Sequence, residues 1–203
     1  MTLNEEHGHI DIFTKIYNTK LWGDNKNEFY NGSSGSGSCL KNNVEYNDFV
    51  TSFIKNNGIK KVVDLGCGDW QSTEYIYKEV DVEYHGYDAF KDLIIHHEQK
   101  YPQYNFHHVD ILNNFDVIEQ ADLCILKDVI QHWTCKEIEH FMKKNSNKFK
   151  FILICNCKNQ LYDWQDVDST RWRPLNANKF PLKKYNPKIE LEFFTKQISV
   201  IYN

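Results

Sequence analysis

The sequence predicts an α/β protein with a Rossmann-like, doubly wound sheet of seven strands, mostly parallel and with an antiparallel C-terminal hairpin. Short apolar runs alternate with helical patterns from residue 61 to residue 155, and such alternation produces βαβ units with parallel strands. The last two apolar runs, 190–194 and 197–202, are separated by only two residues. So short a connection permits an antiparallel hairpin and excludes a parallel crossover.

The elements follow in chain order. Apolar residues at near-helical spacing predict helices over 9–22 and 43–57, on either side of the Ser/Gly-rich loop 31–38. The predicted strands that follow are 61–65, 82–87, 105–109, 121–126 and 149–155. The predicted helices among them are 70–79, 90–100 and about 134–146. A long irregular insertion over 157–188 precedes the hairpin, and insertions of this length in a compact domain are usually functional or disordered.

Length and charge limit the class of protein. The 203 residues suit one domain, and no apolar run approaches the ~20 residues of a membrane span. The N-terminus is acidic and polar, unlike a targeting segment, so we expect a cytoplasmic protein with no membrane partner. Residues 1–142 carry 12 basic and 23 acidic side chains (net −11) and residues 143–203 carry 12 and 5 (net +7), which together give −4. Nucleic acid is therefore an unlikely partner, whereas the basic last third either favours an anionic ligand or is a solvated surface.

Cysteine and histidine positions give no metal motif. The six cysteines contain no Cys-x-x-Cys pair, which is typical of reduced thiols in a cytosol-like compartment. The histidine doublets 96–97 and 107–108 consist of sequence neighbours, and neighbours point apart on strands and helices. We therefore expect no metal site.

A glycine turn follows the first predicted strand. Gly66 and Gly68 let a nucleotide-like ligand approach the backbone closely. Dinucleotide-binding enzymes carry a third glycine where this chain has Gln71. Asp64 and Asp69 flank the turn, and their charge would repel a pyrophosphate. The motif suits a cofactor that bears positive charge.

Acidic residues end the next two strands as well. Asp88 follows Gly68 by 20 residues, the place where a carboxylate accepts hydrogen bonds from ribose hydroxyls. Asp110 ends the third strand on the same edge of the sheet, where it would hold an adenine amino group. A single strand-end Asp is often only a helix cap, but three at consecutive strand ends predict a nucleoside-bearing cofactor.

These motifs resemble those of class I S-adenosylmethionine (SAM)-dependent methyltransferases. Residues 64–69 (DLGCGD) resemble the family's first motif, Asp88 its ribose-binding acid and Asp110–Ile111 its adenine-contact motif, and the terminal hairpin also matches. The resemblance covers about residues 44–203 and implies SAM as cofactor. The residues it implies for cofactor binding are Asp64, Gly66, Cys67, Gly68, Asp69, Asp88, Asp110, Ile111 and Lys127.

Further motifs resemble small bacterial and viral-type members of this superfamily. They are a Ser-Gly-x-Gly-Ser loop (34–38), a Lys/Arg-Asp-Val-x-x-His segment (127–132) and an Arg-Pro-Leu segment (173–176). The last departs from the family pattern, because Ala177 replaces a Leu and the order is Phe180-Pro181. The resemblance implies that residues 1–42 form an N-terminal helix and a Ser/Gly-rich lid. It implies that residues 43–203 form the methyltransferase domain, with 157–188 on the substrate side.

Asp128 and His132 are the predicted catalytic residues. A hydroxyl acceptor needs a base, and residues four apart share a face if they lie on one helical turn. Either His132 is the base and Asp128 orients it, or Asp128 acts directly; a capping Asp and a packed His are the structural alternative. The residues expected to contact the acceptor are Ser36, Gly37, Ser38, Trp133, Arg171 and Arg173.

The expected function is SAM-dependent methylation of a small molecule such as a sugar or nucleotide sugar in glycan biosynthesis. The acceptor is anionic if the charge asymmetry is functional. The alternatives are a protein or RNA methyltransferase and a non-catalytic, cofactor-binding partner subunit.

Overall fold

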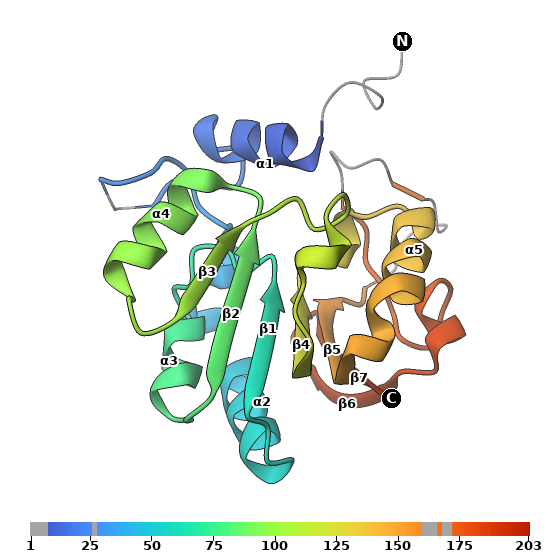
Figure 1. Cartoon of the computed structure of the whole chain (residues 1–203). Coiled ribbons are helices and arrows are strands. Elements are labelled where there is room, and N and C mark those ends of the chain that lie inside the picture. The colour runs from blue at the N-terminus through green and yellow to red at the C-terminus, as the bar shows by residue number, and fades with distance from the viewer. Residues whose placement is uncertain (1–7, 26–27, 160–165, 168–171) are drawn as a thin grey trace.

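A computed structural model describes residues 8–25, 28–159, 166–167 and 172–203 (Figure 1). Its seven strands form one sheet in the order β3-β2-β1-β4-β5-β7-β6. The strands are β1 (Lys61–Leu65), β2 (Glu83–Asp88), β3 (Asn105–His108), β4 (Ala121–Lys127), β5 (Phe149–Cys157), β6 (Lys188–Phe193) and β7 (Lys196–Tyr202). Strands β1 to β5 pair in parallel, and β7 is antiparallel to both β5 and β6. The predicted fold class is confirmed.

The helices lie close to their predicted positions but are shorter. They are α1 (His9–Asn18), α2 (Val44–Asn56), α3 (Thr73–Lys78), α4 (Lys91–Lys100) and α5 (Cys135–Asn145). Helix α1 ends before the predicted residue 22 because Lys20 has a left-handed backbone (φ 56°). Helix α3 begins after the predicted residue 70 because Trp70 is also left-handed (φ 58°) and is buried among aromatic side chains.

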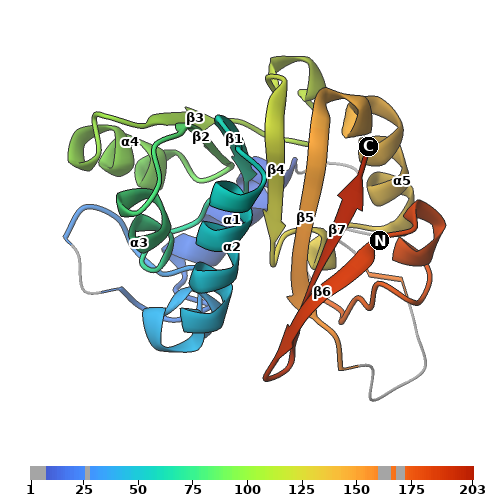
Figure 2. The ribbon, with the colours of Figure 1, turned by 90° about the horizontal axis from the view of Figure 1, so that it is seen from below.

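Helices cover both faces of the sheet. Val62 and Val63 of β1 point to opposite faces, as neighbours on a strand must, and each belongs to a different apolar cluster. Helices α2, α3 and α4 pack on the first face, and α5 packs on the second. Figure 2 shows α2 and α3 on one side of the sheet and α5 on the other.

The connection from β3 to β4 lacks an α-helix. Residues 109–120 contain only one 3₁₀ turn, Phe115–Val117. Helix α5 lies over β4 and β5, so β1, β2 and β3 face the viewer of Figure 1 without a helix in front of them.

Strand direction decides which residues meet at one edge. Strands β1 to β5 all end at the upper edge in Figure 1, below helix α1. Because β7 is antiparallel, it starts there, and Lys196 pairs with Cys157 at the end of β5. The edge therefore combines five strand ends with the start of β7.

All six cysteines are free thiols. Among the described residues, no helix is both long and apolar enough to cross a membrane.

Candidate active site

A cavity of about 470 Å³ lies at this edge of the sheet, within the range of small-molecule and cofactor sites. Strand ends, helix α1 and the Ser/Gly segment line it together. The sequence-predicted residues in its wall are Asp64, Gly66, Cys67, Gly68, Asp88, Asp110, Ile111, Lys127, Asp128, His132, Trp133, Ser36, Gly37 and Ser38. Of the other predicted residues, Asp69 and Arg173 do not line the cavity, and Arg171 lies outside the described residues.

The glycine turn after β1 is held from two sides. Gly66 (φ 74°) and Gly68 (φ 59°) have left-handed backbones, which glycine adopts without steric cost. The Gly68 N–H donates to Asp88 Oδ2 at 3.0 Å, and the Gly68 carbonyl accepts from His97 Nε2 at 2.8 Å. Burial lowers the pKa of His97 to about 4, so a neutral imidazole supports the turn from behind.

Asp88 lies at the tip of β2 with its carboxylate fixed in place. Its two oxygens accept the N–H groups of Gly68 and Phe90, each at 3.0 Å. Burial raises the pKa of Asp88, and only 8% of the residue is exposed. Each carboxylate oxygen has a second lone pair, so the group can still accept two hydroxyl donors from the cavity.

Asp64, next to the last residue of β1, is oriented by a chain of hydrogen-bonded aromatic side chains. Trp70 Nε1 donates to the Tyr84 hydroxyl at 2.9 Å, and that hydroxyl donates to Asp64 Oδ2 at 3.0 Å. Burial raises the pKa of Asp64 to about 7. Two carboxylates, Asp64 and Asp88, therefore lie around one cavity, and burial disfavours the ionised form of each.

We expect Asp64→Asn to change how stability depends on pH. The pKa of Asp64 in the folded protein, about 7, exceeds the ordinary value of 3.8. As the pH rises, the Asp64 carboxyl therefore ionises in the unfolded chain before it ionises in the folded protein. The wild type then loses stability between about pH 4 and pH 7, by roughly 1.4 kcal/mol per pKa unit, and loses no more above that range. Asparagine cannot ionise and still accepts from Tyr84. Urea unfolding measures this: from pH 5 to pH 8 the free energy of unfolding of the variant should rise relative to that of the wild type. An equal change in both proteins would contradict this account.

Asp110 joins the end of β3 to the start of α1. Its Oδ2 accepts the His9 N–H at 3.2 Å and Asn113 Nδ2 at 2.8 Å, and its Oδ1 accepts the Leu112 N–H at 3.2 Å. A carboxylate at a helix N-terminus is favoured by the helix dipole. Asp110 thereby seats α1 over the cavity, beside Ile111.

The Ser/Gly segment is attached to the glycine turn through Asp69. Asp69 Oδ2 accepts the Ser34 N–H at 3.0 Å and the Ser38 hydroxyl at 3.2 Å, and its own N–H donates to Ser34 Oγ at 2.7 Å. Ser34 Oγ also bonds the Tyr17 hydroxyl of α1 at 2.6 Å. Asp69 thus fixes the part of the cavity wall to which Ser36 and Gly37 belong.

Asp69→Ala is expected to loosen this wall. The change removes two bonds to the segment, so backbone amides of residues 33–38 should exchange hydrogen faster, and cofactor affinity should fall roughly tenfold. Hydrogen-exchange mass spectrometry and calorimetry measure the two effects. Asp48→Ala, at an exposed position of α2, is the matched control. Unchanged exchange over residues 33–38 in the Asp69 variant would refute the anchoring role.

Asp128 lies between two lysines. Its oxygens form ion pairs with Lys127, at 3.1 Å, and with Lys196 of β7. Burial favours the neutral acid, but the two ammonium groups outweigh it and hold the pKa of Asp128 below its ordinary value. Lys127 also donates to the Gly37 carbonyl at 2.8 Å, so this cluster contacts the Ser/Gly segment.

The predicted shared helical face of Asp128 and His132 does not form. Asp128 has a left-handed backbone (φ 60°), and the following 3₁₀ turn spans only Ile130–His132. No hydrogen bond joins the two side chains. The His132 ring instead contacts Trp22, with ring centres 5.3 Å apart, and the edge of Phe13, at 6.1 Å.

Trp133 and Arg173 are both buried and make packing and hydrogen-bond contacts with the protein. Trp133 is 2% exposed and packs on Phe141 of α5 with ring centres 5.3 Å apart. The buried Arg173 donates to the Trp133 carbonyl at 2.7 Å and pairs with Asp166 at 3.3 Å. Arg173 thus links the segment that begins at residue 172 to Trp133, which directly follows the 3₁₀ turn Ile130–His132.

Several wall residues have no motif in the sequence. Phe13 and Tyr17 of α1, Tyr46 of α2 and Lys196 all line the cavity. Helical periodicity places Phe13 and Tyr17 on the apolar face of α1, but only the position of α1 above the strand ends brings them to the site. Lys196 reaches Asp128 across 68 positions of sequence, which no local pattern indicates.

Solved structures share this fold. Magnesium protoporphyrin IX methyltransferase from Synechocystis PCC 6803, crystallised with bound SAH, matches with a TM-score of 0.61 and 13% identity over 95% of this chain and 98% of that one. The chain has the class I methyltransferase fold. The methyltransferase domain of bacterial CtHen1 matches with a TM-score of 0.61 and 15% identity, over 79% of this chain and 99% of that one. A putative O-methyltransferase from Nostoc punctiforme PCC 73102 also gives 0.61, with 11% identity over 79% and 56%.

No family model matches the sequence, and no curated protein matches it. The methyltransferase fold is therefore established by the structure, while the sequence resemblance rests on the strand-end motifs.

Proposed function

We propose that this protein is a SAM-dependent methyltransferase whose cofactor binds in the cavity at the strand ends. The Synechocystis enzyme of the same fold was crystallised with SAH and, in a second structure, with SAM. The observation that carries the proposal is Asp88, a buried carboxylate at the tip of β2 whose oxygens are fixed by Gly68 and Phe90.

The donor set fits such a cofactor. Asp64 and Asp88 are buried acids whose pKa values are raised, so a cationic ligand would offset a charge that the protein alone does not balance. Asp88 would accept from ribose hydroxyls, and Asp64 would face the cationic end. Asp110 and Ile111 line the part of the cavity below α1, where a base would lie.

The residues at and after the end of β4, Lys127, Asp128 and His132, would contact the methyl acceptor together with Lys196. When bound, the cofactor supplies an electrophilic methyl group; the protein's task is to orient the acceptor atom and remove its proton. We propose that His132 is the base. Asp128 holds Lys127 and Lys196 with both of its oxygens and is less basic than an ordinary carboxylate, so it acts as a positioning residue.

The acceptor we propose is a small anionic molecule, such as a sugar or nucleotide sugar. Lys127 and Lys196 place two ammonium groups in the cavity wall around Asp128, and ammonium groups are suitable partners for an acceptor's phosphate or carboxylate. Trp172, exposed at the cavity, gives a flat apolar surface suited to a sugar ring.

A methyl-transfer assay with labelled SAM tests this proposal against sugar nucleotides, short peptides and RNA. We expect transfer to a sugar nucleotide, with KM raised several-fold by Lys196→Ala. Transfer to RNA or peptide alone would contradict the proposed acceptor, and transfer to none of them, with SAM bound, would favour a non-catalytic partner subunit.

A further inference from the structure

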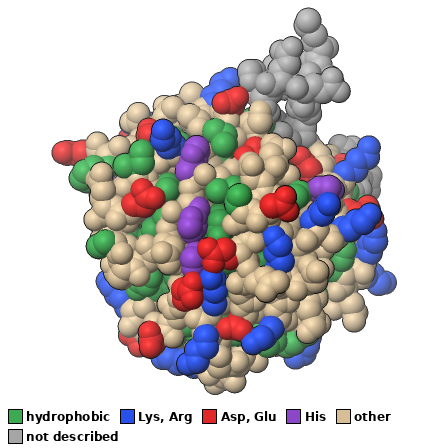
Figure 3. All heavy atoms as spheres, viewed as in Figure 1, with side chains coloured by type: hydrophobic (Ala, Val, Ile, Leu, Met, Phe, Trp, Pro, Cys, Tyr) green, Lys and Arg blue, Asp and Glu red, His purple; other side chains and the backbone are tan. Residues whose placement is uncertain are grey.

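A second cluster of chemistry-bearing side chains lies on the face of the sheet that has no helix over β1, β2 and β3. Glu83 and His85 extend from β2, His107 from β3 and Glu119 from the connection before β4. Figure 3, viewed from the same side as Figure 1, shows histidine, acidic and basic side chains gathered over these strands. This cluster is not part of the cavity wall.

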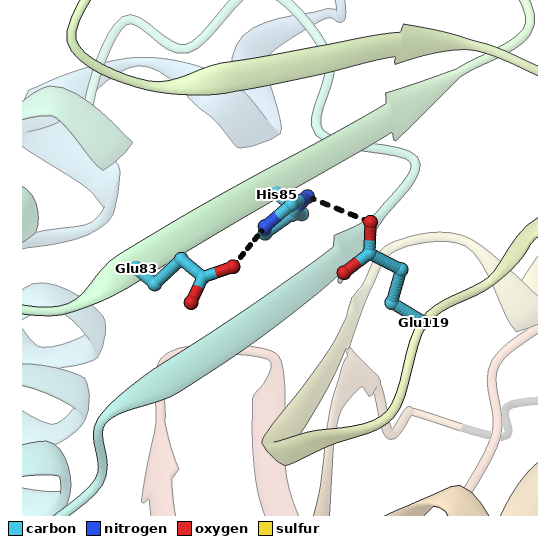
Figure 4. A group of neighbouring side chains, drawn as sticks. All are labelled: Glu83, His85 and Glu119. Carbon is cyan, nitrogen blue, oxygen red and sulfur yellow. Dashed lines mark hydrogen bonds and ion pairs between the residues drawn. The ribbon is translucent and has the colours of Figure 1, made fainter.

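The histidine of β2 is the centre of the cluster. His85 Nδ1 lies 3.0 Å from His107 Nε2 and 3.7 Å from a carboxylate oxygen of Glu119. The two imidazole rings are stacked with an angle of 4° between their planes. One ligand atom each of Glu83, His85 and Glu119 lies within 4.8 Å of the other two. Figure 4 shows His85 between the two glutamates.

These separations match those around a metal ion. Zinc bonds to histidine nitrogen and carboxylate oxygen are ~2.0–2.2 Å long, so neighbouring ligand atoms of a tetrahedral site are roughly 3.3 Å apart. The two measured separations from His85 Nδ1 lie on either side of that value. His107 and Glu119 therefore each lie close enough to His85 Nδ1 to share one ion with it, once their side chains turn toward a common point.

Glu83 contacts the other ring nitrogen of His85. Its carboxylate lies 2.7 Å from His85 Nε2, so a neutral His85 carries its proton on Nε2 and presents the lone pair of Nδ1. A carboxylate on the far nitrogen is the usual partner of a metal-binding histidine. For His107, a shift of its proton to Nδ1 would free Nε2 without releasing a proton from the protein.

We propose that His85, His107 and Glu119 bind one divalent transition-metal ion, with Zn²⁺ as the best fit, and that Glu83 orients His85. The site would join β2 and β3 to the connection before β4, on the part of the sheet that lacks a covering helix. Its role would be structural, because it lies outside the cavity that holds the proposed active site.

Lys61 is the group with which a metal ion would compete. Its ammonium donates to Glu83 at 2.7 Å and also to Glu119, so it offsets part of the negative charge of the two carboxylates when no metal is bound. The side chain starts on β1 and is 23% exposed, which leaves it a path into solvent. Lys61→Met should therefore strengthen metal binding.

The test is calorimetric titration of the full chain, previously freed of metal with EDTA, with Zn²⁺. We expect one ion per chain at submicromolar Kd and a raised melting temperature. His107→Asn and Glu119→Gln should each weaken binding at least tenfold, Glu83→Gln roughly 10- to 100-fold, and Lys61→Met should tighten it. His140→Asn, an exposed histidine on α5, is the matched control and should bind as the wild type does.

Two results would overturn the proposal. One is equal Zn²⁺ affinity in the His107 and His140 variants, which would place the binding elsewhere. The other is weaker binding by Lys61→Met, which would show that the lysine supports the cluster and does not compete with the ion. Circular dichroism confirms that each variant folds.

Discussion

Replacing Asp88 by alanine is expected to weaken SAM binding by roughly two to four orders of magnitude. The change removes the two charge-assisted hydrogen bonds that we propose between Asp88 and the ribose, each worth ~1.5–3 kcal/mol. It also frees the N–H groups of Gly68 and Phe90, which loosens the turn that the cofactor must approach. Calorimetry of wild type and variant measures the loss directly.

Two further variants separate this effect from a general loss of structure. Asp88→Asn keeps the shape and one acceptor oxygen, so its affinity should lie between those of wild type and Asp88→Ala. Asp92→Ala, at an exposed position of α4, should bind like the wild type. Full affinity in Asp88→Ala would remove the observation on which the proposed function depends.

Replacing His132 by alanine is expected to lower kcat by a factor of about 10²–10⁴, the usual contribution of a general base. Cofactor affinity should change little, because Asp64, Asp88 and Asp110 are untouched. Loss of kcat at constant SAM affinity is the result that a merely structural histidine would not give. The measurement is steady-state kinetics with the acceptor identified by the methyl-transfer panel.

The base has a competing candidate in Asp128, which the same kinetics distinguishes. As a positioning residue, Asp128→Asn should raise KM for the acceptor more than it lowers kcat, because it loosens Lys127 and Lys196. If His132→Ala retains full kcat while Asp128→Asn loses it, the base is the Asp128 carboxylate and not His132.

The strand ends are the part of this molecule that the sequence predicts best. The apolar runs that end at or beside Asp64, Asp88 and Asp110 place one end of each strand at the same edge, since parallel strands share a direction. That single geometric rule gathers three distant acids around one cavity. The short gap between the last two runs likewise predicts the antiparallel hairpin.

Side-chain partners across the fold are less predictable. Asp69 belongs to the glycine-rich motif by sequence, yet it anchors the Ser/Gly segment through Ser34 and Ser38. Asp128 appears four residues before His132 and suggests a pair, but its left-handed backbone and Lys196 direct it elsewhere. Both outcomes depend on contacts between segments that are far apart in the chain.

The proposed metal site shows the same limit. From the sequence no metal site is expected, because histidines in the doublets point apart. The cluster forms across strands: β2 and β3 pair with Tyr87 opposite His107, which brings His85 and His107 onto one face and within 3.0 Å of each other. His108, the sequence neighbour of His107, takes no part in the cluster.

Calorimetric titration of the wild-type chain with SAM tests the central claim most directly. We expect a single site with Kd in the micromolar range, and competition by SAH for the same site. The absence of detectable SAM binding by the folded wild-type protein would contradict the account, whatever acceptor is supplied.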